Sequence, residues 1–125
     1  MNKAAIILFA HGARDPQWAE PFKKIQKRIT KKLNDVKVEL AFLELMQPSL
    51  EDAVKNLTTQ KINKITVIPL FLAQGGHLKE DLPRLLNDIR KKNPEISFNV
   101  TSALGETEQI LTAICDWACG EYKKI

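Results

Sequence analysis

The sequence predicts an α/β fold: a three-layer α/β/α domain around a four-stranded parallel sheet. Apolar runs of strand length alternate four times with segments of helical periodicity, which is typical of right-handed βαβ units. The first of these runs is apolar at every position, as expected for a strand covered on both faces by helices. Because no low-complexity linker or charge block interrupts the 125 residues, we expect a single domain over residues 1–125.

The first half of the chain predicts two strand–helix units. The first strand spans residues 4–10 (AAIILFA), and the next helix begins at Asp15 and Pro16, which suit a cap and a first turn. Apolar residues of that helix recur every three or four positions, at Trp18, Phe22, Ile25, Ile29 and Leu33. A second strand over residues 36–45 precedes a helix over residues 48–57, whose apolar side carries Leu50, Ala53, Val54 and Leu57.

The second half repeats the pattern. The third strand spans residues 64–72, and its regular part is expected to end near Pro69, which cannot donate a ladder hydrogen bond. A helix over residues 81–92 follows, with Pro83 in its first turn, and then a fourth strand over residues 96–101. The last helix is expected from residue 106 to about residue 119, with an apolar side made of Ile110, Leu111, Ile114, Cys115 and Ala118. So small a sheet has free edges, which favours self-association.

Composition excludes several classes of partner. The net charge is +4, and basic residues crowd residues 23–37, which indicates a solvated helix face first and an electrostatic aid for an anionic ligand second. A nucleic-acid interface would need aromatic platforms, and the one tyrosine is Tyr122, far from the lysines. No run of about 18 apolar residues is present, so no membrane span is expected. With no signal peptide recognised, the expected location is the cytoplasm.

Two cysteines, Cys115 and Cys119, lie four residues apart in the last helical segment. That spacing on one helix is not a standard disulfide framework, and an iron–sulfur site would need more thiolates than this chain has. We expect both to be small hydrophobic core residues.

Both histidines follow apolar runs. His11 ends the first strand, Glu44 lies at the end of the second, and His77 follows the third strand after Gly75 and Gly76. Loops after parallel strands meet at one edge of the sheet, where ligands bind. Imidazoles and a carboxylate suit Co, Fe, Ni or Zn, and an incomplete ligand set leaves coordination positions open.

Each of these residues has an ordinary structural explanation as well. A histidine beside a glycine is often a cap or a packing residue, and Glu44 could face solvent on an edge strand. The residues alone therefore support a metal or anion site on a flavodoxin-like half-domain.

Three segments resemble a known family. The stretches "LFAHGARDP", "VELAFLELMQPSLEDAV" and "ITVIPLFLAQGGHLKEDLPRLL" are similar to the signature regions of the sirohydrochlorin cobaltochelatases of the short, CbiX type, relatives of SirB-type ferrochelatases. The resemblance runs from about residue 5 to residue 90, and "ALGETEQI" matches more loosely. The resemblance implies a chelatase-like half-domain and a class II lyase that needs neither ATP nor a cofactor beyond the substrate metal. It also implies that two copies of the chain form a homodimer.

The resemblance also implies roles for residues. His11, Glu44 and His77 correspond to the family's metal-handling, catalytic residues; Glu44 would complete the coordination or accept a pyrrole proton, and activity should fall as the histidines protonate. Sirohydrochlorin carries many carboxylates, so Arg14 and Arg84 are candidate substrate contacts. Gly75 and Gly76 would let a planar ligand approach the backbone. Gln74, Ser49 and Ser102 are candidate polar neighbours.

The expected function is therefore insertion of a divalent metal, with Co²⁺ first, into sirohydrochlorin in cobalamin or siroheme biosynthesis. Fe²⁺ and Ni²⁺ remain alternatives, because the same ligands accept them. A non-catalytic carrier of metal or tetrapyrrole is the alternative of a different class. The chain has no histidine-rich tail or cysteine cluster of the kind that some relatives carry, so storage or iron–sulfur roles are not expected.

Overall fold

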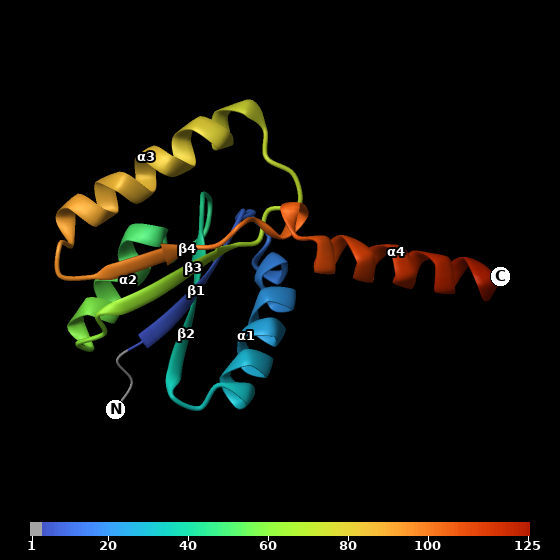
Figure 1. Cartoon of the computed structure of the whole chain (residues 1–125), viewed down its shortest axis with the longest axis horizontal. Coiled ribbons are helices and arrows are strands. Elements are labelled where there is room, and N and C mark those ends of the chain that lie inside the picture. Colours follow the sequence, from blue (N-terminus) through green and yellow to red (C-terminus); the bar gives the residue numbers. More distant parts are fainter. Residues whose placement is uncertain (1–3) are drawn as a thin grey trace.

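A four-stranded parallel sheet forms the centre of the structure, a computed structural model that describes residues 4–125 (Figure 1). Its strands are β1 (Ala4–Ala10), β2 (Val36–Phe42), β3 (Lys64–Pro69) and β4 (Ser97–Val100), in the spatial order β2-β1-β3-β4. Every neighbouring pair is parallel. This confirms the predicted fold class and puts the C-terminal ends of all four strands at one edge of the sheet.

The helices are α1 (Glu20–Lys32), α2 (Leu50–Thr59), α3 (Gly76–Lys92) and α4 (Glu108–Lys123), with short 3-10 helices η1 (Pro16–Ala19) and η2 (Leu104–Glu106) before α1 and α4. Asp15 caps η1, where its side chain accepts a hydrogen bond from the Gln17 N–H. None of the described helices is long and apolar enough to cross a membrane.

The core has two parts, one on each face of the sheet. The larger part packs α2 and α3 against the sheet through residues such as Phe9, Leu57, Val67 and Leu82. The smaller part packs α1 against β2 through Val38, Leu40 and Phe42. Consecutive strand residues alternate between the two faces, and both faces of β1 are covered, which is why β1 reads as a continuous apolar run.

Strand β2 is shorter than predicted, β3 ends where the sequence predicted, and β4 is one residue shorter at each end. Strand β2 ends at Phe42 rather than at residue 45, and Leu45 adopts a left-handed backbone with φ 65°. Strand β3 ends at Pro69, as its missing N–H predicted. Apolar character alone cannot mark either end, since Leu43 and Leu70 remain apolar past the last regular residue.

Helix α3 begins five residues earlier than predicted, at Gly76, so Pro83 lies inside the helix and not in its first turn. A proline inside a helix removes one backbone hydrogen bond and costs about 3 kcal/mol. The apolar side of α3 offsets that cost, because Leu78, Leu82, Leu86 and Ile89 are all buried against the sheet. His77 consequently belongs to the first turn of a helix.

Helix α4 contradicts the prediction for the C-terminal segment. It extends away from the body of the molecule (Figure 1) and has no buried residue. Cys115 and Cys119 are exposed free thiols and not core residues. The apolar periodicity was present, but periodicity shows that a helix has an apolar side and not that the same chain covers that side.

Candidate metal site

His11 and Glu44 meet at the edge formed by the C-terminal ends of the strands. His11 follows β1 directly, and Glu44 lies two residues beyond the end of β2. The Nδ1 atom of His11 is 3.1 Å from Oε1 of Glu44, and both side chains are 44 % exposed. In the tautomer that donates from Nδ1, the Nε2 atom carries the free lone pair, which is the arrangement of a carboxylate-oriented metal ligand.

The backbone around Gly12 brings these two side chains together. A Cβ atom at Gly12 would lie 1.8 Å from the carbonyl oxygen of Glu44, so no residue with a side chain fits this close approach. The Leu43 N–H also donates to the Ala10 carbonyl at 2.8 Å, which continues the pairing of β1 with β2 past the sheet. The glycine of the sequence motif is therefore explained by contact with the segment that carries Glu44.

Two further contacts fix His11. The indole N–H of Trp18 donates to the His11 carbonyl oxygen at 2.7 Å. The buried Phe71 ring meets the imidazole edge-on, with the ring centroids 4.8 Å apart. Phe71 is itself tied to η2, because its carbonyl oxygen accepts the Gly105 N–H at 3.1 Å. His11 is thus held by Trp18, which lies in η1 shortly after it, and by Phe71, which follows β3.

His77, in the first turn of α3, lines a pocket together with His11 and Glu44. The pocket has a volume of about 480 Å³ and opens to solvent. Its lining consists of His11, Glu44, His77 and Asp81 together with Leu43, Leu78, Gly75 and Gly76. The structure therefore brings the three predicted metal-handling residues, and both predicted glycines, to one cavity.

The side chains of His11, Glu44 and His77 do not converge on one metal position. Among residues 4–125, no three His, Cys, Asp or Glu side chains lie close enough to hold one metal ion. The contact pair is His11 with Glu44, and His77 stands apart from it. A Cβ at Gly75 or Gly76 would meet nothing within 4 Å, so this wall leaves room for a ligand.

Other candidate residues lie outside the pocket. Arg14 and Arg84 are exposed and are not part of its lining. Ser49 caps α2, where its Oγ accepts the Asp52 N–H, and Gln74 and Ser102 are also absent from the lining. Asp81 is the lining residue that the sequence reasoning missed; its spacing of four from His77 places both on one side of a helix, and that signal is visible only once α3 is known to begin at Gly76.

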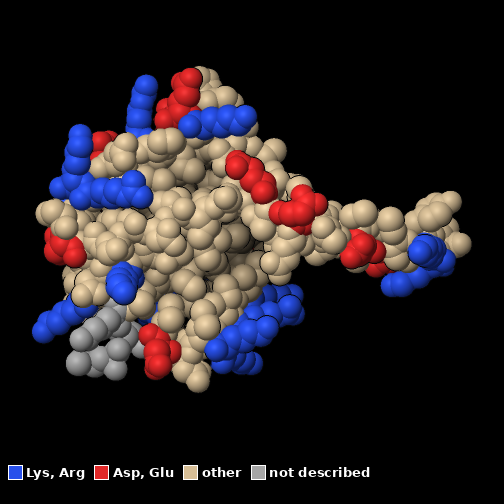
Figure 2. All heavy atoms as spheres, viewed as in Figure 1, with Lys and Arg blue, Asp and Glu red and all other residues tan. Residues whose placement is uncertain are grey.

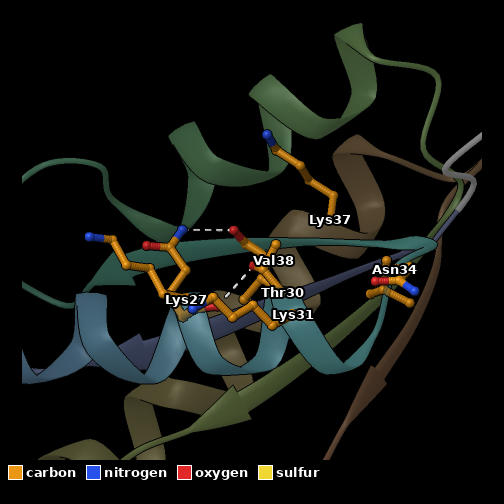
Figure 3. A pocket seen from close by; sticks show the side chains of 8 residues that line it. Lys27, Thr30, Lys31, Asn34, Lys37 and Val38 are labelled. Atoms are coloured by element: carbon orange, nitrogen blue, oxygen red, sulfur yellow. Dashed lines mark hydrogen bonds between the residues drawn. The ribbon is translucent and has the colours of Figure 1, made fainter.

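A second cavity, of about 520 Å³, lies between α1 and β2 (Figure 3). Lys27, Lys31 and Lys37 line it, and the Gln26 side-chain amide donates to the Val38 carbonyl at 2.8 Å. It is bordered by Asn34 and Val36, at the start of β2, whereas Glu44 follows the end of that strand. The lysine cluster is therefore a solvated flank of α1 and not part of the metal-site pocket.

Comparisons with known proteins point in one direction. A family model described as CbiX matches residues 5–119. A protein of Saccharolobus islandicus (strain L.S.2.15 / Lassen #1) named sirohydrochlorin cobaltochelatase is 35% identical over 111 residues, which are 84% of this chain and 85% of that protein. A Saccharolobus solfataricus protein of the same name is 36% identical over 111 residues, with the same coverage of both chains.

Solved structures agree in fold. The crystal structure of a putative cobalamin biosynthesis CbiX protein from Marinobacter aquaeolei VT8 matches with a TM-score of 0.83 and 30% identity, over 98% of this chain and 99% of that one. The sirohydrochlorin chelatase SirB from Bacillus subtilis subspecies spizizenii, in complex with cobalt, matches with a TM-score of 0.76 and 24% identity. This match covers 91% of the present chain and 49% of the SirB chain, so one copy corresponds to half of that fold.

Proposed function

The chain belongs to the CbiX family, and from that membership we propose that it is a sirohydrochlorin chelatase whose metal substrate is Co²⁺. The observation that supports this pocket as the site of the reaction is the contact of His11 with Glu44, in a pocket that His77 also lines. Relatives at 35% and 36% identity carry the cobaltochelatase name, which favours Co²⁺. The reaction belongs to the biosynthesis of cobalamin if the metal is Co²⁺ and of siroheme if it is Fe²⁺.

Metal insertion sets three chemical requirements. The metal must lose part of its hydration shell, two pyrrole N–H protons must leave, and the protein must hold the metal loosely enough to pass it on. Few protein ligands and an open pocket meet the first and third requirements, since open positions accept incoming nitrogen donors. No ATP is needed for a step that exchanges ligands and protons at a site of this kind.

His11 is the metal ligand in this scheme, through Nε2. Glu44 accepts the hydrogen bond from Nδ1, which fixes the ring and makes Nε2 a better donor. Because the Glu44 side chain is 44 % exposed and lines the pocket, we assign its other carboxylate oxygen as the acceptor of a pyrrole proton. The position of His77 across the pocket supports a role as a second ligand during transfer, once metal draws the two walls together.

We propose further that residues 1–125 act as one chelatase unit in the cytoplasm and that two copies form a homodimer. The support for the dimer is size: this chain covers about half of the SirB fold. The substrate carboxylates then meet basic residues outside the pocket lining, with Arg14 and Arg84 as the candidates.

An anaerobic absorbance assay tests the function. Purified protein is mixed with sirohydrochlorin and Co²⁺, Fe²⁺ or Ni²⁺ in turn, and the rate of spectral change is compared with the uncatalysed rate. Acceleration with Co²⁺ above the other two supports the proposal, and acceleration that is greatest with Fe²⁺ or Ni²⁺ reassigns the metal. Stoichiometric binding of tetrapyrrole without acceleration for any metal would identify a carrier instead.

A further inference from the structure

Asp81 lines the metal-site pocket without a contact that explains its presence there. It lies on α3, four residues after His77, which lines the same pocket. The first turn of α3 holds no acidic residue, and Asp81 comes after that turn, so the partial charge of the helix N-terminus does not account for it. Within residues 4–125, no ion pair or hydrogen bond joins its carboxylate to another side chain. Asp81 is therefore an available acceptor beside the pocket.

The neighbouring charged residues of α3 differ from Asp81 in what they face. Figure 2 shows acidic and basic side chains together over α3, at the top of the view. Lys79 and Glu80 are exposed and are not part of the pocket lining. The lining contains no lysine or arginine, and its two carboxylates are those of Glu44 and Asp81. Asp81 is thus the charged residue of this part of α3 that borders a cavity.

His77 needs a partner for its second ring nitrogen if it is to bind metal. A neutral imidazole binds metal through one nitrogen and carries a proton on the other, and that N–H nearly always donates to a carboxylate, a carbonyl or water. Glu44 already contacts His11 in this way, at 3.1 Å. In the part of the chain that the structure describes, His77 makes no hydrogen bond with another side chain. The remaining carboxylate in the lining is that of Asp81.

The helix places Asp81 over the turn that carries His77. Residues four apart on a helix have Cβ atoms about 5–6 Å apart. Side chains on a helix lean toward its N-terminus, so the Asp81 carboxylate leans toward His77. Leu78 and Leu82, which directly follow the two residues, are each 8% exposed and pack in the core. That packing fixes this turn of the backbone, so a change of side-chain rotamer is enough to bring the two groups into contact.

The short side chain of aspartate selects the nearer ring nitrogen of His77. In histidine, Nδ1 is bonded to the ring carbon that carries Cβ, whereas Nε2 lies at the far side of the ring. With the two Cβ atoms about 5–6 Å apart, the Asp81 carboxylate meets Nδ1 and leaves Nε2 for a ligand in the pocket. His11 already has this arrangement, because Glu44 contacts its Nδ1.

We propose that Asp81 is the positioning residue of His77: its carboxylate accepts a hydrogen bond from Nδ1 while Nε2 binds the substrate metal. The inference rests on the proposed function, because it takes His77 as the second metal ligand. The pocket then holds two carboxylate–imidazole pairs, one after β1 and β2 and one on α3. Two carboxylates in a lining without basic residues also attract a divalent cation.

Nuclear magnetic resonance of the ring nitrogens tests the pairing without turnover. His11 and His77 are the two histidines of the chain, so the full chain labelled with nitrogen-15 histidine gives few signals, and His77→Ala identifies those of His77 by their loss. Zn²⁺ is the probe, because it accepts the same ligands and is diamagnetic. In the zinc-loaded protein, His77 is expected to bind through Nε2 and to carry on Nδ1 a proton that exchanges slowly with water.

Three variants of α3 decide between Asp81 and its surroundings. Asp81→Asn is expected to speed exchange of the Nδ1 proton about tenfold or more, because a neutral amide is a weaker acceptor than a carboxylate. Asp81→Glu keeps the carboxylate and should retain slow exchange. Glu80→Gln is the matched control, since Glu80 lies three residues after His77 but outside the lining, and it should change nothing. An unchanged Nδ1 proton in Asp81→Asn, a zinc bond through Nδ1, or a wild-type His77 that binds no zinc would each overturn the inference.

The rate of Co²⁺ insertion gives a second measurement. Asp81→Asn is expected to lower that rate about 10-fold, the smaller end of the loss for an orienting partner. Because Asp81 acts through His77, the double variant His77→Ala with Asp81→Asn should be no slower than His77→Ala. A further loss in the double variant would show that Asp81 itself meets the metal or a pyrrole proton, and the positioning role would be wrong. A wild-type protein without acceleration contradicts the proposed function, whereas the ring-nitrogen measurement still decides the pairing.

Discussion

The Nδ1 atom of His11 lies 3.1 Å from Oε1 of Glu44, although 33 residues separate the two in the sequence. The contact depends on the parallel pairing of β1 with β2, which puts Ala10 opposite Phe42 and so brings the residues after both strands to one place. The contact therefore orients the imidazole in the absence of any metal.

Replacement of Glu44 by glutamine tests whether the carboxylate orients His11. Glu44→Gln removes the charge that favours the Nδ1–H tautomer, so we expect Co²⁺ affinity to fall about 10- to 100-fold, as for other partners of ligating histidines. Anaerobic titration calorimetry measures the affinity. Glu51→Gln is the matched control, because Glu51 pairs with Lys92 on the exposed surface. Unchanged affinity in Glu44→Gln would show that the hydrogen bond plays no part in metal binding.

The two histidines are expected to differ in importance. His11→Ala removes the oriented ligand, so Co²⁺ binding should weaken by more than the roughly 100-fold loss of an orienting partner. His77→Ala leaves the His11–Glu44 pair intact and should mainly lower the rate of insertion. Binding by calorimetry and rate by absorbance separate the two effects. If His77→Ala abolished Co²⁺ binding while His11→Ala retained it, the roles assigned here would be reversed.

Gly12→Ala should damage both stability and the site. The new Cβ would lie 1.8 Å from the Glu44 carbonyl oxygen, so the backbone must shift, at a cost on the order of 1–3 kcal/mol in the free energy of unfolding. Urea unfolding measures that cost. The control is Gly120→Ala, where a Cβ meets nothing within 4 Å and a helix gains up to about 1 kcal/mol. Similar stabilities for both variants would contradict the close approach.

Trp18→Phe removes one hydrogen bond and keeps an aromatic ring. The indole N–H donates to the His11 carbonyl at 2.7 Å, and its loss should lower the free energy of unfolding by ~0.5–1.5 kcal/mol. Because that carbonyl belongs to the proposed metal ligand His11, Co²⁺ affinity should fall as well, by several-fold. Phe22→Leu is the comparison, since Phe22 packs against both Trp18 and Phe42, so this variant disturbs the packing and keeps the hydrogen bond. An equal effect of both variants on affinity would mean that packing, and not the hydrogen bond, positions His11.

Much of the fold could be read from the sequence because burial on both faces leaves a strong local signal. Residues 4–10 are apolar without interruption, and that is the pattern of β1 between two helical layers. Asp15 and Pro16 marked a helix start correctly to within the short η1 segment. The start of α3 was missed because Pro83 suggested a first turn, while the burial of Leu78 and Leu82 outweighed that local preference.

The meeting of three candidate residues at one cavity was predictable from the sequence, and their mutual geometry was not. His11, Glu44 and His77 could be placed at one sheet edge from the order of strands and loops. That His11 contacts Glu44 and not His77 depends on the backbone approach at Gly12, which periodicity does not encode. The position of α4 could not be predicted for a similar reason. The sequence shows the apolar side that carries Ile110 and Ile114, but the close approach of Gly105 to the Leu72 carbonyl, just before α4, is a tertiary contact.

The hydrogen bond from Gly105 to Phe71 links the start of α4 to the candidate metal site. Phe71 contacts the His11 ring on one side and η2 on the other, and η2 leads directly into α4. A change in the position of η2 is therefore expected to reach the imidazole through one backbone hydrogen bond and one ring contact. The segment around residue 105 thus supports the orientation of a side chain that directly follows the first strand.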